Sequence, residues 1–245
     1  PCMSPIAMIF NQMKIIAIGD IHGRNVWEAI VARESDADMF VFLGDYFDTR
    51  ESIGPLDQIS NFKKIYEFKR HNPKRVTLLL GNHDYHYLDG VTDRYSGYDA
   101  GYATAYKVEL EYALSAEFLQ VAFVAYDRLL FTHAGVTKTW CDNHNIDHAN
   151  TLSISGDIND LFSRFRDAFA FQGKNPYGDS VESGPLWVRP LSLSIDRIDE
   201  YRQIVGHTQM PQIDCIAPTI RIDTLGTSGE YLEIIGGTTF NIKKI

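Results

Sequence analysis

The sequence predicts a mixed α/β protein in which two β-sheets pack as a sandwich. Three observations predict it: apolar strand-like runs that each end in polar residues, helix-like stretches between the first of these runs, and short strand-like runs separated by glycines near the C-terminus. Parallel strands need crossover helices, whereas short runs joined by tight turns are typical of antiparallel pairs. A chain that carries both patterns is expected to form mixed sheets.

The first half of the chain is predicted to form a βαβαβ unit. Each spacing between successive apolar runs is long enough for a crossover helix. Apolar residues recur at helical spacing in both intervening segments, and Pro55 suits a first helical turn. The expected strands are 14–18, 39–43 and 75–80, and the expected helices are 24–34 and 55–70.

The second half changes character. Two further helices are expected, at 102–118 and 157–171. Residues 119–126 and 128–132 flank Asp127 as two strands of a hairpin, and another strand is expected at 203–205. Three glycine-separated runs resemble antiparallel strands, namely 219–223, 230–235 and 238–242.

Composition favours one catalytic domain. The chain has 245 residues, and no linker rich in Pro, Gly or Ser divides it. We therefore expect a single domain over residues 13–245, preceded by an N-terminal extension or an expression remnant at residues 1–12. The net charge of −9, from 23 basic and 32 acidic residues, includes no basic run, so long nucleic acid is not an expected partner.

Other features favour a cytoplasmic protein. The three cysteines are few and widely spaced, which fits a reducing compartment better than a disulfide scaffold. No apolar run approaches the length of a membrane span, so a membrane partner is not expected. The first twelve residues lack the basic start of a secretory signal.

Five short motifs carry the chemistry. Each follows an expected strand, and ligands at strand ends converge on one crevice in open α/β sheets. In order they are Gly19-Asp20-Ile21-His22-Gly23, Gly44-Asp45, Gly81-Asn82-His83-Asp84, His133-Ala134-Gly135 and Gly206-His207-Thr208. Single motifs have simpler explanations: Gly-Asp is a common turn, and His133 or His207 alone could be a hydrogen-bonded core histidine. Their joint occurrence in this order favours a shared site.

The residue types predict two metal ions. Asp20 and His22 lie two residues apart, so both side chains share one face of an extended segment and can bind one metal. Asp45 can bridge two cations, because a carboxylate has two oxygens. Asn82, His133 and His207 would complete the second position. Imidazole and carbonyl ligands suit Mn, Fe or Zn rather than Ca.

With these motifs the chain resembles the calcineurin-like metallophosphoesterases over nearly its whole length. The resemblance implies a four-layer αββα sandwich and two metal ions, Mn and/or Fe, with Zn possible. It also implies that a metal-bridging water or hydroxide attacks phosphorus in line while both metals polarise the phosphoryl oxygens. Asp20, His22 and Asp45 would then hold one metal, and Asp45, Asn82, His133 and His207 the other.

The resemblance also assigns the remaining site residues. His83 would be the general acid that protonates the leaving oxygen, and Asp48 would orient it and raise its pKa. The alternatives are a supporting hydrogen bond to a ligand for His83 and a helix or turn cap for Asp48. Arg50 and Arg189 are the candidates for phosphate binding. The alternative for Arg189 is a surface arginine beside a buried Trp187.

Departures from the family pattern indicate a branch. Gln209 stands where nuclease-like members usually have a second histidine, which favours the branch of the serine/threonine protein phosphatases and the symmetrical dinucleoside polyphosphatases. The first expectation is a metal-dependent phosphomonoesterase acting on a phosphorylated substrate. A symmetrical dinucleoside polyphosphate hydrolase is the alternative enzyme, and a non-catalytic metal-binding scaffold is the alternative from another class.

One segment outside the motifs is unusual. Residues 85–112 hold seven tyrosines interleaved with aspartates. The rings either overhang the metals and stack on a peptide or nucleobase, or belong to an ordinary packed loop and helix.

Overall fold

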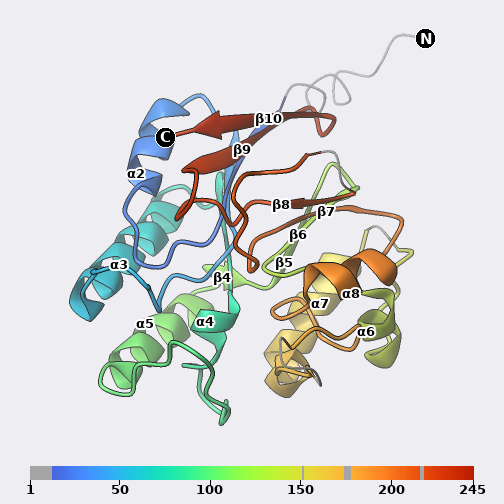
Figure 1. Ribbon diagram of the computed structural model, residues 1–245, viewed down its shortest axis with the longest axis horizontal. Coiled ribbons are helices and arrows are strands. Elements are labelled where there is room, and N and C mark those ends of the chain that lie inside the picture. The colour runs from blue at the N-terminus through green and yellow to red at the C-terminus, as the bar shows by residue number, and fades with distance from the viewer. Residues whose placement is uncertain (1–12, 151, 174–177, 216–217) are drawn as a thin grey trace.

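The computed structural model describes residues 13–150, 152–173, 178–215 and 218–245. Residues 1–12, the expected extension, lie outside this part. Two β-sheets lie face to face with helices on both outer sides (Figure 1). The predicted two-sheet α/β sandwich is confirmed.

The first sheet has six strands in the order β10-β9-β1-β2-β3-β4. Strands β1 to β4 are parallel, and the β9–β10 hairpin adds antiparallel to β1. The helices α2 (Trp27–Arg33), α3 (Pro55–His71) and α5 (Ala103–Ser115) connect the parallel strands, so the βαβαβ prediction is confirmed. The strands are β1 (Lys14–Ile18), β2 (Met39–Phe42), β3 (Val76–Leu79), β4 (Leu119–Gln120), β9 (Glu230–Ile235) and β10 (Thr239–Lys244).

The second sheet has four strands in the order β5-β6-β7-β8. β5 (Ala122–Ala125) and β6 (Leu129–Thr132) form the expected hairpin, whereas β6, β7 (Arg202–Val205) and β8 (Thr219–Arg221) run parallel. Its outer side carries α6 (Lys138–Asn143), α7 (Ile154–Arg164), a 3₁₀ helix (Arg166–Phe169) and α8 (Pro190–Ile195).

Side-chain alternation along the strands separates two apolar cores. In β1, Ile15 and Ala17 point between the sheets, whereas Ile16 and Ile18 point toward the helices. Burial of both faces of the central strands explains why they are continuous apolar runs. The inter-sheet core also holds Val41, Leu43, Leu79, Phe131, Ile204, Ile220, Leu232 and Ile234.

Three predicted elements differ from the structure. The run 119–126 is not one strand: it divides into β4 and β5 in different sheets, and at the crossing the backbone N–H groups of Val121 and Ala122 donate to Asn159 Oδ1 instead of to a strand. The predicted helix 157–171 begins earlier and is interrupted at Phe165, whose φ of −150° is not helical. The run 219–223 does not pair with the C-terminal hairpin, because β8 lies parallel to β7.

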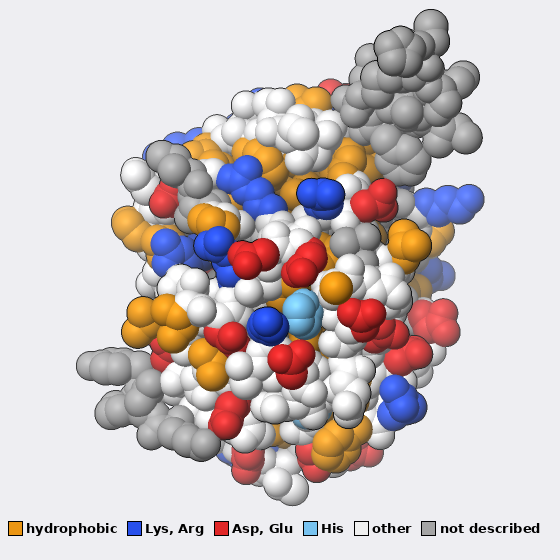
Figure 2. Space-filling model, turned by 90° about the vertical axis from the view of Figure 1, so that its right-hand side faces the viewer, with side chains coloured by type: hydrophobic (Ala, Val, Ile, Leu, Met, Phe, Trp, Pro, Cys, Tyr) orange, Lys and Arg blue, Asp and Glu red, His pale blue; other side chains and the backbone are white. Residues whose placement is uncertain are grey.

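Within the described ranges, no helix combines the length and apolar character needed to span a bilayer. On the face shown in Figure 2, basic side chains are scattered among acidic ones rather than gathered into a stripe. That face does not offer the continuous basic surface that tracks a phosphate backbone.

Candidate metal centre

The carboxyl ends of β1, β2, β3, β6 and β7 meet at one pocket of about 370 Å³. A short helix, α4 (Asn82–Tyr85), starts directly after β3 and carries two of the predicted residues. The predicted residues that line the pocket are His22, Asp45, Asp48, Arg50, Asn82, His83, Arg189 and His207. Asp20 and His133 are buried and contact this set. The structure therefore brings all ten predicted residues together.

Asp20, His22 and Asp45 form the first ligand group. One ligand atom from each lies within 4.8 Å of the others. His22 Nδ1 is 2.8 Å from the carbonyl oxygen of Phe47 and must donate to it, which leaves Nε2 facing Asp45 Oδ2 at 3.7 Å. The neutral imidazole thus presents its lone pair toward the carboxylates, as a metal ligand does.

Asn82, His133 and His207 form the second group. His133 Nδ1 donates to the carbonyl oxygen of Leu43 at 2.7 Å, and its Nε2 lies 2.9 Å from Asn82 Oδ1 and 3.4 Å from Asp45 Oδ2. His207 Nδ1 lies 2.8 Å from the same amide oxygen. Asp45 Oδ2 therefore lies near an imidazole of each group.

The lone pairs of the second group test whether a cation fits. Because His133 Nδ1 donates to the carbonyl oxygen of Leu43, a neutral ring turns the lone pair of Nε2 toward Asn82 Oδ1, which is also an acceptor. A cation bound by both atoms would satisfy these two buried acceptors. Imidazole, carboxylate and amide oxygen are donors that suit Mn, Fe or Zn, so the residues fit two such ions.

The charges of the site also favour cations. Burial, and repulsion from Asp223 and Asp45, raise the pKa of Asp20 well above its usual value. Burial alone would raise the pKa of Asp45 as well, but the charges of His133 and His83 hold it well below its usual value. Burial, with repulsion from His133, lowers the pKa of His207, which keeps its ring neutral. Closely spaced buried carboxylates are stabilised by divalent cations, which supply the missing positive charge.

The backbone at the site is unusual. Four predicted residues adopt left-handed φ angles: His22 (42°), Asp45 (52°), Asp48 (60°) and His207 (63°). Such conformations cost free energy in non-glycine residues and cluster at functional sites. Two glycines admit the carboxylates: a Cβ on Gly81 would lie 2.1 Å from Asp45 Oδ1, and one on Gly206 would lie 2.0 Å from Asp20 Oδ1.

Asp48 and His83 form a hydrogen-bonded pair beside the ligand groups. Asp48 Oδ2 accepts from His83 Nδ1 at 3.0 Å, which leaves the Nε2 of His83 for the pocket. Burial lowers the pKa of His83, but the negative charges of Asp45 and Asp48 outweigh it and raise the pKa overall. Asp48 is bonded to side chains here and is not a helix or turn cap.

The tyrosine-rich segment supports this pair from behind. Asp48 Oδ2 also accepts from His86 Nε2 at 2.7 Å, and Asp48 Oδ1 accepts from the Tyr87 hydroxyl. Tyr87 in turn accepts from the backbone N–H of Asp99 at 2.8 Å. None of the seven tyrosines lines the metal pocket. The structure thus favours the packed loop and helix over a stacking platform.

Tyr87→Phe is expected to lower the free energy of unfolding by about 1–3 kcal/mol, because the carboxylate of Asp48 and the N–H of Asp99 would both lose a buried partner. Chemical denaturation measures this change. Tyr102→Phe is the matched control, since Tyr102 is exposed and its hydroxyl makes no hydrogen bond to the described residues. Equal effects of both substitutions would contradict a specific role of Tyr87.

The two arginines differ in their surroundings. Arg189 is partly buried, and its Nη1 lies 3.4 Å from the carbonyl oxygen of His207 and 3.3 Å from Thr208 Oγ1. Trp187 is buried and donates to the carbonyl oxygen of Phe169. Arg50 is exposed at the pocket rim. Both guanidinium groups can reach an anion in the pocket, but only Arg189 is fixed by its neighbours.

Asp223 also lines the pocket, although it belongs to none of the five sequence motifs. It is buried and follows β8 at the strand's carboxyl end, the same placement as the predicted ligands. Burial and the charge of Asp45 raise its pKa to about 6. The rule that polar residues after strands converge could have found it, but no motif marked it.

Asp223→Asn is expected to stabilise the metal-free protein at pH 7 by about 2–3 kcal/mol. A carboxyl whose pKa is raised by folding binds more protons in the folded state than in the unfolded state. Its unfavourable contribution to the free energy of unfolding is therefore absent below about pH 4 and complete above about pH 6. The advantage of the variant in chemical denaturation should therefore shrink from pH 7 to pH 4. An advantage that does not change with pH would contradict the raised pKa.

Comparisons with known proteins identify a family and a shared fold. The family model of the calcineurin-like phosphoesterases matches residues 13–211. A cold-active protein-tyrosine phosphatase of a psychrophilic Shewanella species is similar in structure, with a TM-score of 0.57 and 19% identity over 96% of this chain and 84% of the other. A protein serine/threonine phosphatase from Saccharomyces cerevisiae has a TM-score of 0.57 and 16% identity over 96% and 81%.

No curated protein sequence matches the chain. At these identities the two phosphatases show a shared fold and no more. The family model covers most of the chain and includes all five motifs. The chain therefore belongs to the calcineurin-like phosphoesterases, enzymes that hydrolyse phosphoric esters.

Proposed function

We propose that the protein is a metal-dependent phosphomonoesterase of the branch that contains the serine/threonine protein phosphatases. The observation that carries the proposal is the combination of two ligand groups that share Asp45 with a hydrogen-bonded Asp48–His83 pair at the same pocket. A scaffold that only binds metal has no chemical need for His83. We also propose that residues 13–245 act as one catalytic domain in the cytoplasm, since the C-terminal hairpin completes the first sheet beside β1.

Each residue has a proposed role. Asp20, His22 and Asp45 hold one metal, and Asp45, Asn82, His133 and His207 hold the other, with Mn and Fe the preferred ions. When bound, the two metals supply Lewis-acid polarisation of the phosphoryl group and activation of the attacking water. His83 donates a proton from Nε2 to the leaving oxygen, and Asp48 holds its Nδ1–H and stabilises the imidazolium. Asp48 thus acts as a positioning residue.

Arg189→Ala is expected to raise KM for a phosphomonoester by about tenfold or more, because a charge-assisted contact to phosphate is lost. Arg50→Ala should have a smaller effect, since that side chain is exposed and screened by solvent. Steady-state kinetics of Arg189→Ala and Arg50→Ala measures the two effects on KM separately. Arg189→Lys, which keeps the charge but not the planar fork, should recover only part of the affinity. Unchanged KM in all three variants would place the phosphate contact elsewhere.

Hydrolysis assays test the proposal. Metal-stripped protein is supplied with Mn, Fe, Zn, Mg or no metal and offered p-nitrophenyl phosphate, phosphoserine and phosphotyrosine peptides, and diadenosine tetraphosphate. Metal-dependent release of phosphate from the monoesters supports a phosphomonoesterase. Preferred cleavage of the dinucleotide would replace it with the polyphosphate hydrolase, and metal binding without turnover would replace it with the scaffold.

A further inference from the structure

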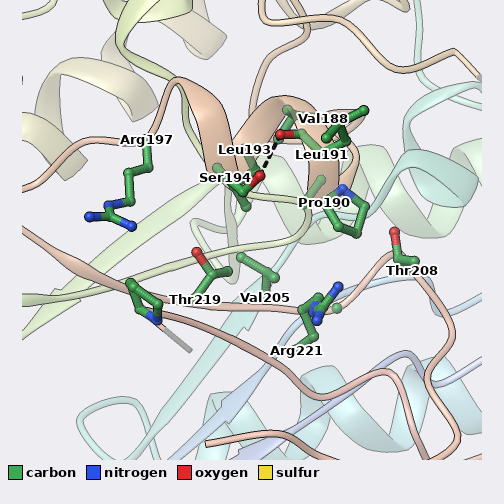
Figure 3. A pocket seen from close by; sticks show the side chains of 13 residues that line it. Val188, Pro190, Leu191, Leu193, Ser194, Arg197, Val205, Thr208, Thr219 and Arg221 are labelled. Atoms are coloured by element: carbon green, nitrogen blue, oxygen red, sulfur yellow. Dashed lines mark hydrogen bonds between the residues drawn. The ribbon is translucent and has the colours of Figure 1, made fainter. Parts of the chain in front are cut away.

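A second pocket of about 330 Å³ lies beside helix α8 (Figure 3). It is a wedge between the outer face of the second sheet and the short helix α8. Its lining is mainly apolar, with Val188, Leu193 and Val205 among the residues that form it. Pockets for small organic ligands have this size and character, whereas the voids within a packed core rarely exceed a water molecule.

Strand alternation explains why the pocket is there. Ile204 of β7 and Ile220 of β8 point into the core between the sheets, so Val205, Thr219 and Arg221 point to the outer face. Helix α8 spans only six residues, and the pocket lies between it and these three side chains. Ala134, Val188 and Leu193 form a small apolar cluster there, separate from the two main cores.

The charges at the pocket indicate the kind of ligand. Arg197 and Arg221 line it, and no carboxylate does among the residues described, although the chain carries a net charge of −9. Arg197 Nε is bonded to Asp199 Oδ1 at 2.8 Å. Arg221 is half-buried and makes no ion pair within the described parts of the chain. A guanidinium beside an apolar wall suits an anion that carries an apolar body.

The two pockets are back to back and share no lining residue. The segments 188–190, 206–208 and 221–223 contribute residues to both pockets. Within each segment, adjacent or alternate residues line different pockets. Arg189, His207 and Asp223 line the metal pocket. Val188, Pro190, Gly206, Thr208 and Arg221 line the second pocket. A ligand of the second pocket is therefore a separate molecule and not the leaving group of a substrate.

We propose that the second pocket binds a small organic anion with an apolar body, held by Arg221, and that this ligand acts on the metal centre through the shared segments. Its direct contacts would be with Gly206 and Thr208, which flank His207, and Thr208 Oγ1 contacts Arg189. Only the action on catalysis rests on the proposed function. The binding itself can be measured without metal.

The first test uses 8-anilinonaphthalene-1-sulfonate as an anionic probe and N-phenyl-1-naphthylamine as its uncharged counterpart, with metal-stripped protein and fluorescence titration. Arg221→Gln should weaken binding of the sulfonate about tenfold and leave the uncharged probe unaffected. Ser194→Trp, at an exposed position of the pocket lining, should abolish binding of both. Arg128→Gln is the control, because Arg128 is exposed at the opposite end of β6.

Equal sulfonate affinity in the wild type and Arg221→Gln, or binding that survives Ser194→Trp, would overturn the site. Thermal melts that coincide among the variants exclude binding to unfolded protein as the cause. The second test measures the inhibition constant of inorganic phosphate in manganese-loaded protein with and without saturating sulfonate probe. A shift of threefold or more supports the action on the metal centre, and an unchanged constant overturns it. Absence of turnover with every metal would instead refute the proposed function, while the binding test still stands.

Discussion

Asp45→Asn is expected to lower metal occupancy at both positions and to reduce turnover by about three orders of magnitude. Asp45 Oδ2 lies 3.7 Å from His22 Nε2 and 3.4 Å from His133 Nε2, so it is close to both ligand groups. An amide keeps one coordinating oxygen but removes the negative charge between the cations. Metal analysis of the purified variant, together with steady-state kinetics, measures both effects.

Asp160→Asn is the matched control, because Asp160 is exposed on α7 and far from the strand ends. It should leave metal content and turnover unchanged. If Asp45→Asn retains two metals per chain with wild-type affinity, the bridging role is wrong. Loss of only one metal would assign Asp45 to a single position.

His83→Ala is expected to retain metal and to reduce turnover by about two to four orders of magnitude, the range of general acid catalysis. The residue lines the pocket but belongs to neither ligand group, and Asp48 holds its Nδ1. The loss should depend on the leaving group. A phenyl ester with an acidic phenol needs little protonation, so its hydrolysis should suffer less than that of an alkyl phosphate.

His71→Ala provides the comparison, since His71 is exposed at the end of α3. An equal loss for good and poor leaving groups would argue that His83 supports the site without transferring a proton. Loss of metal in His83→Ala would point the same way, because the backbone N–H of His83 donates to Asp45 Oδ1 and a shifted helix α4 would disturb that contact.

The candidate ligands could be predicted because the information is local. Each ligand motif follows a short apolar run, and parallel strands place their carboxyl ends on one edge of the sheet. The βαβαβ order follows from spacing alone, and β1, β2 and β3 lie where the sequence indicates.

Other features depend on residues far apart in the chain. The run 119–126 has uniform strand character, and only Asn159, 37 or more positions later, marks where it leaves one sheet for the other. The role of Tyr87 depends on Asp48, 39 positions earlier. The composition of the tyrosine-rich segment 85–112 fits a platform that stacks on a ligand as well as a packed segment that supports Asp48. Neither case carries a signal within the segment itself.

Neither the position of Asp223 in the metal pocket nor the second pocket could be predicted from the sequence, for a related reason. The run 219–223, which includes Asp223, resembles the C-terminal antiparallel strands in sequence, although β8 pairs with β7 in the second sheet. The second pocket arises where three distant segments each turn successive side chains to opposite sides. Which residues line which pocket depends on the three-dimensional placement of all three segments, and no single segment contains that information.

The left-handed backbone at His22, Asp45, Asp48 and His207 has a consequence for mutagenesis. Asparagine adopts this conformation more readily than other non-glycine residues, because its short amide bonds to the local backbone, whereas alanine carries the full steric cost. An alanine at any of these four positions would remove a functional side chain and also strain the backbone. Asparagine variants separate the lost coordination from the backbone effect. His83 lies inside helix α4, so alanine there adds no strain from a left-handed backbone.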